Sequence, residues 1–179
     1  MRKRTKKLAL LGLAAAIAMA FAYVEVLLPP LFTAVPGIKL GLPNIMIIFV
    51  LYKMGVKEAA AVSLVRLLAV SLLFGNPMTF AYSLAGAVLS LTAMAVLRKL
   101  DLFSIIGVSV TGGVLHNVGQ ILLAMFVLKT AEIGYYLIVL AVAGTIAGIF
   151  IGLCGGFAVK RIKFGDSEDK RYELLLTNR

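Results

Sequence analysis

Arg66 is the residue whose type and position most clearly predict a binding function. It is the only charged residue in an apolar stretch that runs from residue 59 to residue 74. A charged side chain at the centre of a bilayer costs about 2.5–3.5 kcal/mol on insertion scales, so such residues occur chiefly where protein or a water-filled cavity surrounds them. Arg66 is therefore predicted to anchor a small anionic molecule.

A second group of polar residues falls between Gly112 and Gln120. In a helix, Gly112, His116 and Gln120 share one face at intervals of four residues, and Asn117 lies next to it. These side chains offer several hydrogen-bond donors and acceptors on one side of the helix. A single histidine is as readily a structural residue as a ligand-binding one, so both interpretations of His116 stay open.

Glu25, Lys39 and Asn44 are predicted to lie near the level of Arg66 or further outward. An ion pair between Glu25 and Arg66 that only locks two helices is the alternative to ligand binding, and both hold if a substrate anion displaces the carboxylate. The inner half of the predicted helices is almost purely apolar apart from Ser and Thr, which can bond to their own helix. This one-sided distribution predicts a polar pocket open to the outside, not a continuous pore.

The composition indicates which elements must position these residues. Hydrophobic residues make up 61% of the chain and charged residues 15%, and the mean hydropathy is +1.03, which excludes a soluble domain. The net charge of +10 comes from short basic clusters between apolar runs, a pattern that favours membrane topology over nucleic-acid binding. The single cysteine, Cys154, excludes a disulfide or a cysteine metal site within one chain; it is interpreted as a small packing residue.

Six apolar runs are candidates for helices that cross a lipid bilayer, which takes about 20 residues each. They are residues 8–28, 42–52, 56–74, 78–97, 102–128 and 133–159. The second run is too short to cross alone, so it either recruits residues 36–41 or lies beside a thinned, protein-lined region. The predicted fold is an all-α, polytopic bundle of six transmembrane helices over residues 1–164, with a mobile cytoplasmic tail at 165–179.

The basic residues predict the orientation of the bundle, because Lys and Arg in short loops stay on the cytoplasmic side. One side carries only Lys39 and Lys129, and the other carries Arg2, Lys3, Arg4, Lys6, Lys7, Lys53, Lys57, Arg98, Lys99, Lys160, Arg161 and Lys163. Both termini are therefore predicted to be cytoplasmic, in the cell membrane. A cleavable secretory signal that ends at the Ala20-Phe21-Ala22 sequence is the alternative for the N-terminus.

Small residues at intervals of four indicate where helices pack closely in lipid. Ala14, Ala18 and Ala22 form such a series in the first run; packing inside the bundle and docking on a partner are both open for it. The last run carries a longer series, for which packing within the chain is favoured. Its members are Gly144, Gly148, Gly152 and Gly156.

Several segments resemble the membrane family called heptaprenyl diphosphate synthase component I, also known as the Gx transporter family. The segments are residues 36–45, 66–68, 83–86 and 112–120. That family is similar to the substrate-binding S components of energy-coupling factor (ECF) transporters, which are six-helix proteins with an outward-facing pocket. The resemblance implies an S-component-like bundle that takes up a vitamin or cofactor precursor.

The same resemblance implies partners for the chain. In ECF transporters, an alanine surface on the first helix docks on a transmembrane T component that two cytoplasmic ATPases drive. Ala14, Ala18 and Ala22 match that surface, and residues 29–43 match the loop that covers the substrate.

Catalysis by this chain alone is not expected. Prenyl diphosphate synthesis needs clustered aspartates to hold Mg²⁺, and Asp101, Asp166 and Asp169 form no such motif. The sequence contains no P-loop, no recognisable nucleophile and base, and no metal-ligand spacing, so no cofactor or metal is predicted.

We therefore expect the substrate-binding subunit of a multi-subunit importer. The alternative is an accessory membrane subunit in polyprenyl diphosphate or quinone metabolism, whose pocket holds a diphosphate or a quinone headgroup. A self-sufficient secondary transporter is disfavoured because no inverted repeat is visible.

Overall fold

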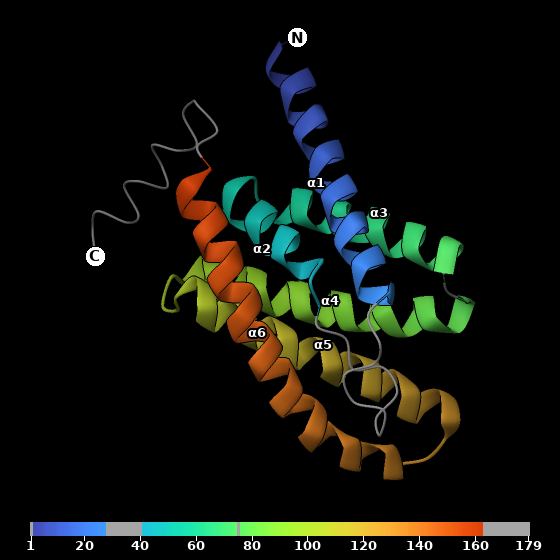
Figure 1. Ribbon diagram of the computed structural model, residues 1–179. Helices are drawn as coiled ribbons and strands as arrows, with labels where there is room; N and C mark the ends of the chain where they lie inside the picture. Colours follow the sequence, from blue (N-terminus) through green and yellow to red (C-terminus); the bar gives the residue numbers. More distant parts are fainter. Residues whose placement is uncertain (1, 28–40, 75, 163–179) are drawn as a thin grey trace.

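The computed structural model describes residues 2–27, 41–74 and 76–162, and within these ranges it contains six α-helices and one short 3-10 helix. In chain order they are α1 (Arg2–Leu27), α2 (Asn44–Lys53), α3 (Val56–Phe74), α4 (Pro77–Leu100), α5 (Ile105–Leu128), η1 (Glu132–Tyr135) and α6 (Tyr136–Arg161), as Figure 1 shows. Four segments are long and apolar enough to cross a membrane: Arg4–Glu25, Pro77–Leu100, Ile105–Leu128 and Glu132–Arg161. The chain is an all-α, polytopic membrane protein.

Local side-chain chemistry determines where two of the long helices begin. The Asn76 side chain accepts a hydrogen bond from the Thr79 N–H at 2.8 Å, and Pro77 occupies the first turn of α4. The Ser104 hydroxyl accepts from the Gly107 N–H at 3.2 Å, so α5 begins at Ile105 and not at the predicted residue 102. Both are N-caps, which satisfy backbone donors that the first helical turn leaves open.

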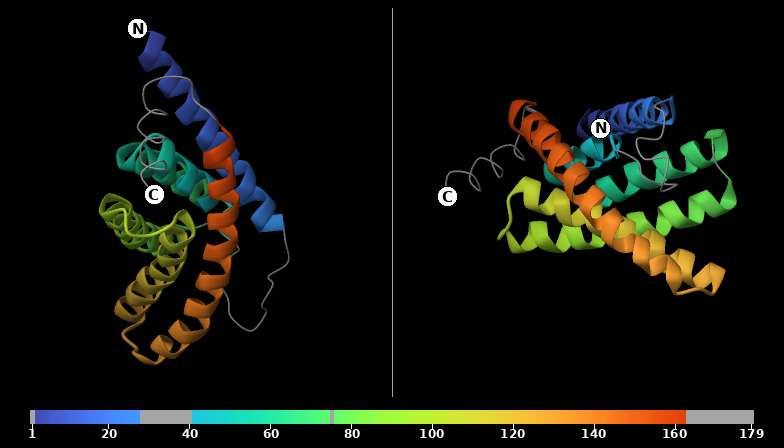
Figure 2. Two further views of the ribbon diagram at one scale, coloured as in Figure 1. Left: turned by 90° about the vertical axis from the view of Figure 1, so that its left-hand side faces the viewer. Right: turned by 60° about the horizontal axis from the view of Figure 1, so that its bottom comes forward.

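The helices form two groups. Helices α3, α4 and α5 pack side by side in chain order, while α1 and α6 lie across them and α2 contacts α1, α3 and α6. Figure 2 shows α1 and α6 together on one side of the α3–α5 stack. Because successive long helices run in opposite directions, the ends of α1, α3 and α5 lie at the same end of the molecule as the starts of α4 and α6.

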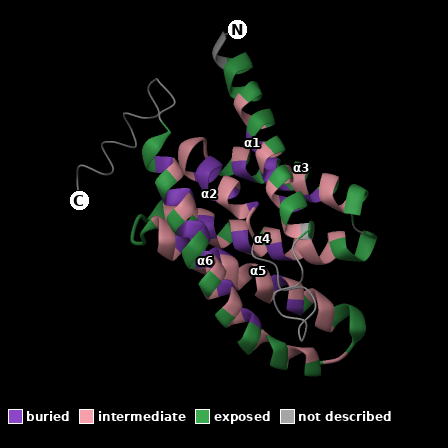
Figure 3. Cartoon of the chain, viewed as in Figure 1, coloured by how far each residue is buried: buried purple, intermediate pink, exposed green. Residues whose placement is uncertain are grey.

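Helix α2 lies at the centre of the bundle. Its five consecutive residues from Ile47 to Leu51 are all buried, so every face of this helix is covered by protein. Figure 3 shows the buried residues gathered around α2, while the outer ends of the other helices are exposed. Its 10 residues span about 15 Å. The helix begins at Asn44, so of the two predicted arrangements the protein-lined one holds.

Glycines allow α6 to approach α5 closely. A Cβ atom on Gly148 would lie 2.6 Å from the Cα atom of Val110, and a Cβ atom on Gly113 would lie 2.5 Å from the carbonyl oxygen of Gly144. Gly152 has a similar contact with Ile106. The predicted packing of the α6 glycine series within the chain is confirmed at Gly144, Gly148 and Gly152, where a larger residue would meet the backbone of α5. At Gly156 an added Cβ atom would be in ordinary contact with Ile105, at 3.7 Å.

The alanine series of α1 is also buried within the chain. Ala18 has 0% of its surface exposed, Ala14 has 4% and Ala22 has 5%. Ala14 and Ala18 belong to the same apolar core as α2 and α3. Their small side chains let α1 pack against its own bundle, and docking of Ala14, Ala18 and Ala22 on a partner stays a prediction that this burial disfavours. The interpretation as internal packing holds.

The basic end of the molecule is held together by specific contacts. Lys7 at the start of α1 forms an ion pair with Glu58 at the start of α3, at 2.5 Å. Arg98 near the end of α4 donates a hydrogen bond to the carbonyl oxygen of Tyr52 near the end of α2, at 3.3 Å. In Figure 1, α1 begins and α6 ends on this same side. The basic clusters in the described part of the chain therefore share one end.

Candidate functional site

A cavity of about 640 Å³ lies at the end of the bundle opposite the basic clusters. It is lined by the second halves of α1, α3 and α5 and by the first halves of α4 and α6, with Gly41 and Asn44 at the start of α2. Six of the seven predicted site residues line it, namely Glu25, Asn44, Arg66, His116, Asn117 and Gln120. The seventh, Lys39, lies outside the described residues.

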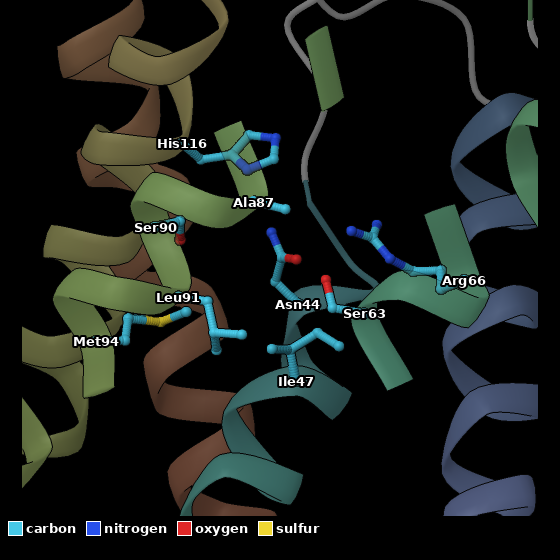
Figure 4. Close-up of a pocket in the computed structure, with 9 residues that line it drawn as sticks. All are labelled: Asn44, Ile47, Ser63, Arg66, Ala87, Ser90, Leu91, Met94 and His116. Carbon is cyan, nitrogen blue, oxygen red and sulfur yellow. The ribbon is translucent and has the colours of Figure 1, made fainter. Parts of the chain in front are cut away.

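Arg66 extends from α3 toward the centre of the bundle. Figure 4 shows its guanidinium directed at Asn44, with Ser63 below it and His116 on the far side. The Nε atom is buried and has no hydrogen-bond partner in the described part of the chain. No carboxylate among the described residues lies within ion-pair distance of it, although Glu25 attracts it over a longer range. A buried donor without a partner costs about 1–3 kcal/mol, so the site favours occupancy by an acceptor.

Glu25 does not form the predicted ion pair with Arg66 but binds a backbone group. Its carboxylate accepts a hydrogen bond from the backbone N–H of Gly41. Gly41 has a φ of +72°, a conformation that glycine adopts readily, and it lies three residues before Asn44. Glu25 thus ties the end of α1 to the start of α2, and a close ion pair with Arg66 is not formed.

His116 lies where α5 and α4 come closest. A Cβ atom on Gly86 would lie 2.6 Å from the carbonyl oxygen of His116 and 3.0 Å from its imidazole Cε1 atom. One turn further along α5, a Cβ atom on Gly119 would lie 2.7 Å from the carbonyl oxygen of Ala85. Gly86 is therefore a positioning residue that the sequence alone did not identify as part of the site.

Asn117 forms a hydrogen bond between two helices and also lines the cavity. Its Nδ2 atom donates a hydrogen bond to the carbonyl oxygen of Leu140 in α6, at 2.7 Å. This bond joins α5 to α6 at a level where Asn117 also contacts Gly144. Because one amide donor is committed, we assign Asn117 mainly to holding the wall, and its carbonyl oxygen and second N–H are the groups left for a ligand.

A second, much smaller cavity of about 10 Å³ continues from the polar part of the first. Asn44, Arg66 and His116 line both cavities, and Ser63 and Ser90 add hydroxyl groups to the smaller one, as Figure 4 shows. Its size is close to that of one water molecule. The two serines were not predicted, because a serine within an apolar helix commonly bonds to its own backbone.

The arrangement is suited to holding a molecule. It provides one cation, several hydrogen-bonding side chains and a large apolar wall, which are the features of a ligand pocket. No group of three or more His, Cys, Asp or Glu side chains that could hold a metal ion occurs among residues 2–27, 41–74 and 76–162.

A family model described as heptaprenyl diphosphate synthase component I matches residues 14–158 of the chain. The matched range begins within α1 and ends within α6, so it includes every described residue that lines either cavity. Neither a curated protein nor a solved structure matches the chain.

Proposed function

The chain belongs to the heptaprenyl diphosphate synthase component I family, and on this premise we propose that it is the substrate-binding subunit of an ECF-type membrane importer. The observation that carries the proposal is the buried Nε atom of Arg66, which has no hydrogen-bond partner among the described residues and lies beside a cavity of about 640 Å³. A positive charge inside a membrane helix is expensive unless it faces such a cavity and serves a ligand. The substrate is a small cofactor or vitamin precursor with an anionic group.

The proposed topology has six helices in the cell membrane and both termini in the cytoplasm. The basic residues at one end of the bundle support it, since Lys and Arg in short loops remain on the cytoplasmic side. The cavity lies at the opposite end and so opens to the outside, as uptake requires. Helix α2 remains inside the protein, whereas α3 directs Arg66 at the cavity and exposes an apolar face that includes Leu64, Leu68 and Leu72.

Energy for transport is proposed to come from partner subunits, a T component and two cytoplasmic ATPases, because the sequence contains no P-loop. Because Ala14, Ala18 and Ala22 are buried within the chain, we propose a different surface for this docking. The exposed face of α1, which includes Ala16 and Ala20, is the surface on this helix that remains accessible.

A second candidate function is an accessory membrane subunit in polyprenyl diphosphate or quinone metabolism. The description of the matching family favours it, and an arginine binds phosphate groups as readily as carboxylates. In this role too the chain binds a molecule and performs no catalysis.

Affinity purification from native membranes distinguishes the two functions. Transport predicts that the tagged chain brings down a transmembrane T subunit and ATPases at fixed ratios. Recovery of a soluble prenyl synthase in their place contradicts transport and supports the accessory role. A matched tag on an unrelated six-helix protein controls for nonspecific capture of abundant membrane subunits.

A further inference from the structure

The large cavity is mostly apolar on the side of η1 and α6, whereas Thr79, Tyr82 and Ser83 add polar groups on the side of α4. Ser71 of α3 and the α5 residues Asn117 and Gln120 also line it. Asn44, Arg66 and His116 lie at its floor, because these three also line the smaller cavity beneath it. The wall that η1 and α6 contribute is apolar except for Tyr136, and its apolar members are Ile133, Leu140, Ala143, Gly144, Ala147 and Ile151. The outer parts of α3 and α5 add Val70, Phe74, Ile121, Ala124 and Leu128.

Among the described residues, Arg66 is the one cation at the floor of the cavity. Glu25 and Arg66 are the charged residues among the described residues that line the cavity. The Glu25 carboxylate accepts the hydrogen bond from Gly41, whereas the Nε atom of Arg66 has no partner in the described part of the chain. One guanidinium matches one carboxylate or phosphate group, which it can bind through two parallel hydrogen bonds.

We propose that the substrate is amphipathic: a single anionic group binds Arg66 at the floor, and an apolar body lies between α6 and the outer parts of α3 and α5. This inference rests on the proposed role in substrate binding and specifies the class of molecule. The length of the apolar wall, which runs from Ile133 at the mouth to Ile151 at the floor, places the anionic end deepest and the apolar end toward the mouth.

Two contributions to affinity follow from this geometry. Each methylene group that leaves water for the apolar wall strengthens binding about three- to fourfold. The anionic group contributes through charge-assisted hydrogen bonds to Arg66, which are stronger than bonds between neutral groups. A compact hydrophilic anion gains only the second contribution, and an uncharged apolar molecule gains only the first.

The test measures binding of straight-chain carboxylates from butanoate to octanoate to the full-length protein in lipid nanodiscs. Each acid is compared with the alcohol of the same chain length, and empty nanodiscs correct for partition into lipid. We expect affinity to rise about threefold per methylene group and octanoate to bind at least tenfold more tightly than 1-octanol. Arg66→Gln should remove the difference between the acid and the alcohol.

Lys160→Gln is the matched control, since it also removes one positive charge, but from an exposed residue in the last turn of α6 that lines neither cavity. Octanoate should bind this variant as tightly as wild type, and an equal loss of binding in both variants contradicts the assignment of Arg66 as the counter-ion. The chain-length series needs only the wild-type protein, so it decides the question even where Arg66→Gln fails to fold.

If acetate or inorganic phosphate binds as tightly as octanoate, the inference of an amphipathic substrate is wrong. The proposed role as a substrate-binding subunit is then unaffected. Absence of binding by every acid in the series also overturns this inference. The role in transport is tested separately by the subunits that copurify, so the two failures are distinguishable.

Discussion

At the scale of single residues, the central fact is that Arg66 is buried without a hydrogen-bond partner for its Nε atom in the described part of the chain. Folding alone gives no reason for this arrangement, because a polar group that leaves water without a partner destabilises the folded state. This cost supports the proposal that Arg66 binds a ligand at the expense of stability.

Replacement of Arg66 by methionine should raise stability and abolish ligand binding. Methionine fills a similar volume without charge, so the ligand-free protein should gain about 1–3 kcal/mol, visible as a higher midpoint of thermal denaturation in detergent. A lower midpoint would show that Arg66 has a structural partner and would contradict its assignment to a ligand.

At the scale of helices, the position of α5 depends on glycines that remove side chains from its contacts with α4 and α6. On the α6 side the contacts are made by Gly144, Gly148 and Gly152, and on the α4 side by Gly86. Such close approach replaces the hydrophobic effect as the source of helix association in lipid. The same contacts hold His116 and Asn117 at the cavity.

Gly148→Ala should destabilise the bundle by about 1–3 kcal/mol, the range for overpacking, because the added Cβ would meet the backbone of Val110 at 2.6 Å. Gly12→Ala is the matched control, since among the described residues no atom outside the neighbouring backbone of α1 lies within 4 Å of its added Cβ and alanine favours the helix. The comparison of the two denaturation midpoints checks the assigned packing; equal midpoints would contradict it.

Helix α1 offers a second comparison between a buried and an exposed alanine. Ala18→Leu should lower the denaturation midpoint, because Ala18 has 0% exposure and lies in the core. Ala16→Leu, on the exposed face, should leave the midpoint unchanged and weaken copurification of a T component. Normal stability of Ala18→Leu would refute the packing of α1, and unchanged copurification with Ala16→Leu would exclude this face from docking.

The sequence predicted those parts of the site that depend on polarity within a single helix. Arg66, His116 and Gln120 stand out because they are polar in apolar runs, and their expected gathering at one end follows from alternating helix directions. The bond from Asn117 to Leu140, the clearance at Gly86 and the burial of α2 depend on which helix is the neighbour. Likewise, alanines at intervals of four suit internal packing and docking equally well, so the burial of these alanines in α1 is known only from the structure.

At the scale of the whole molecule, the basic clusters and the cavity lie at opposite ends. The ion pair between Lys7 and Glu58 and the bond from Arg98 to Tyr52 belong to the basic end, while Arg66 and His116 belong to the cavity end. The proposed importer subunit with an outward-facing pocket requires this arrangement of the two ends, because its substrate arrives on the side away from the basic residues.

The orientation can be tested with single cysteines on a Cys154→Ser background, because Cys154 is the one natural cysteine. Ala131→Cys, between α5 and α6, should react with a membrane-impermeant maleimide added to intact cells. Leu102→Cys, between α4 and α5 and 75% exposed, should react only after the membrane is opened. The reverse pattern would invert the proposed topology.

The most direct test of the central claim is mass spectrometry of the small molecules retained by gently extracted protein. We predict one species that is present at near-stoichiometric amounts with wild type, absent with Arg66→Gln, and retained by Gly12→Ala, which lies far from the cavity. The same species at equal occupancy in wild type and Arg66→Gln would contradict the claim that Arg66 anchors the substrate.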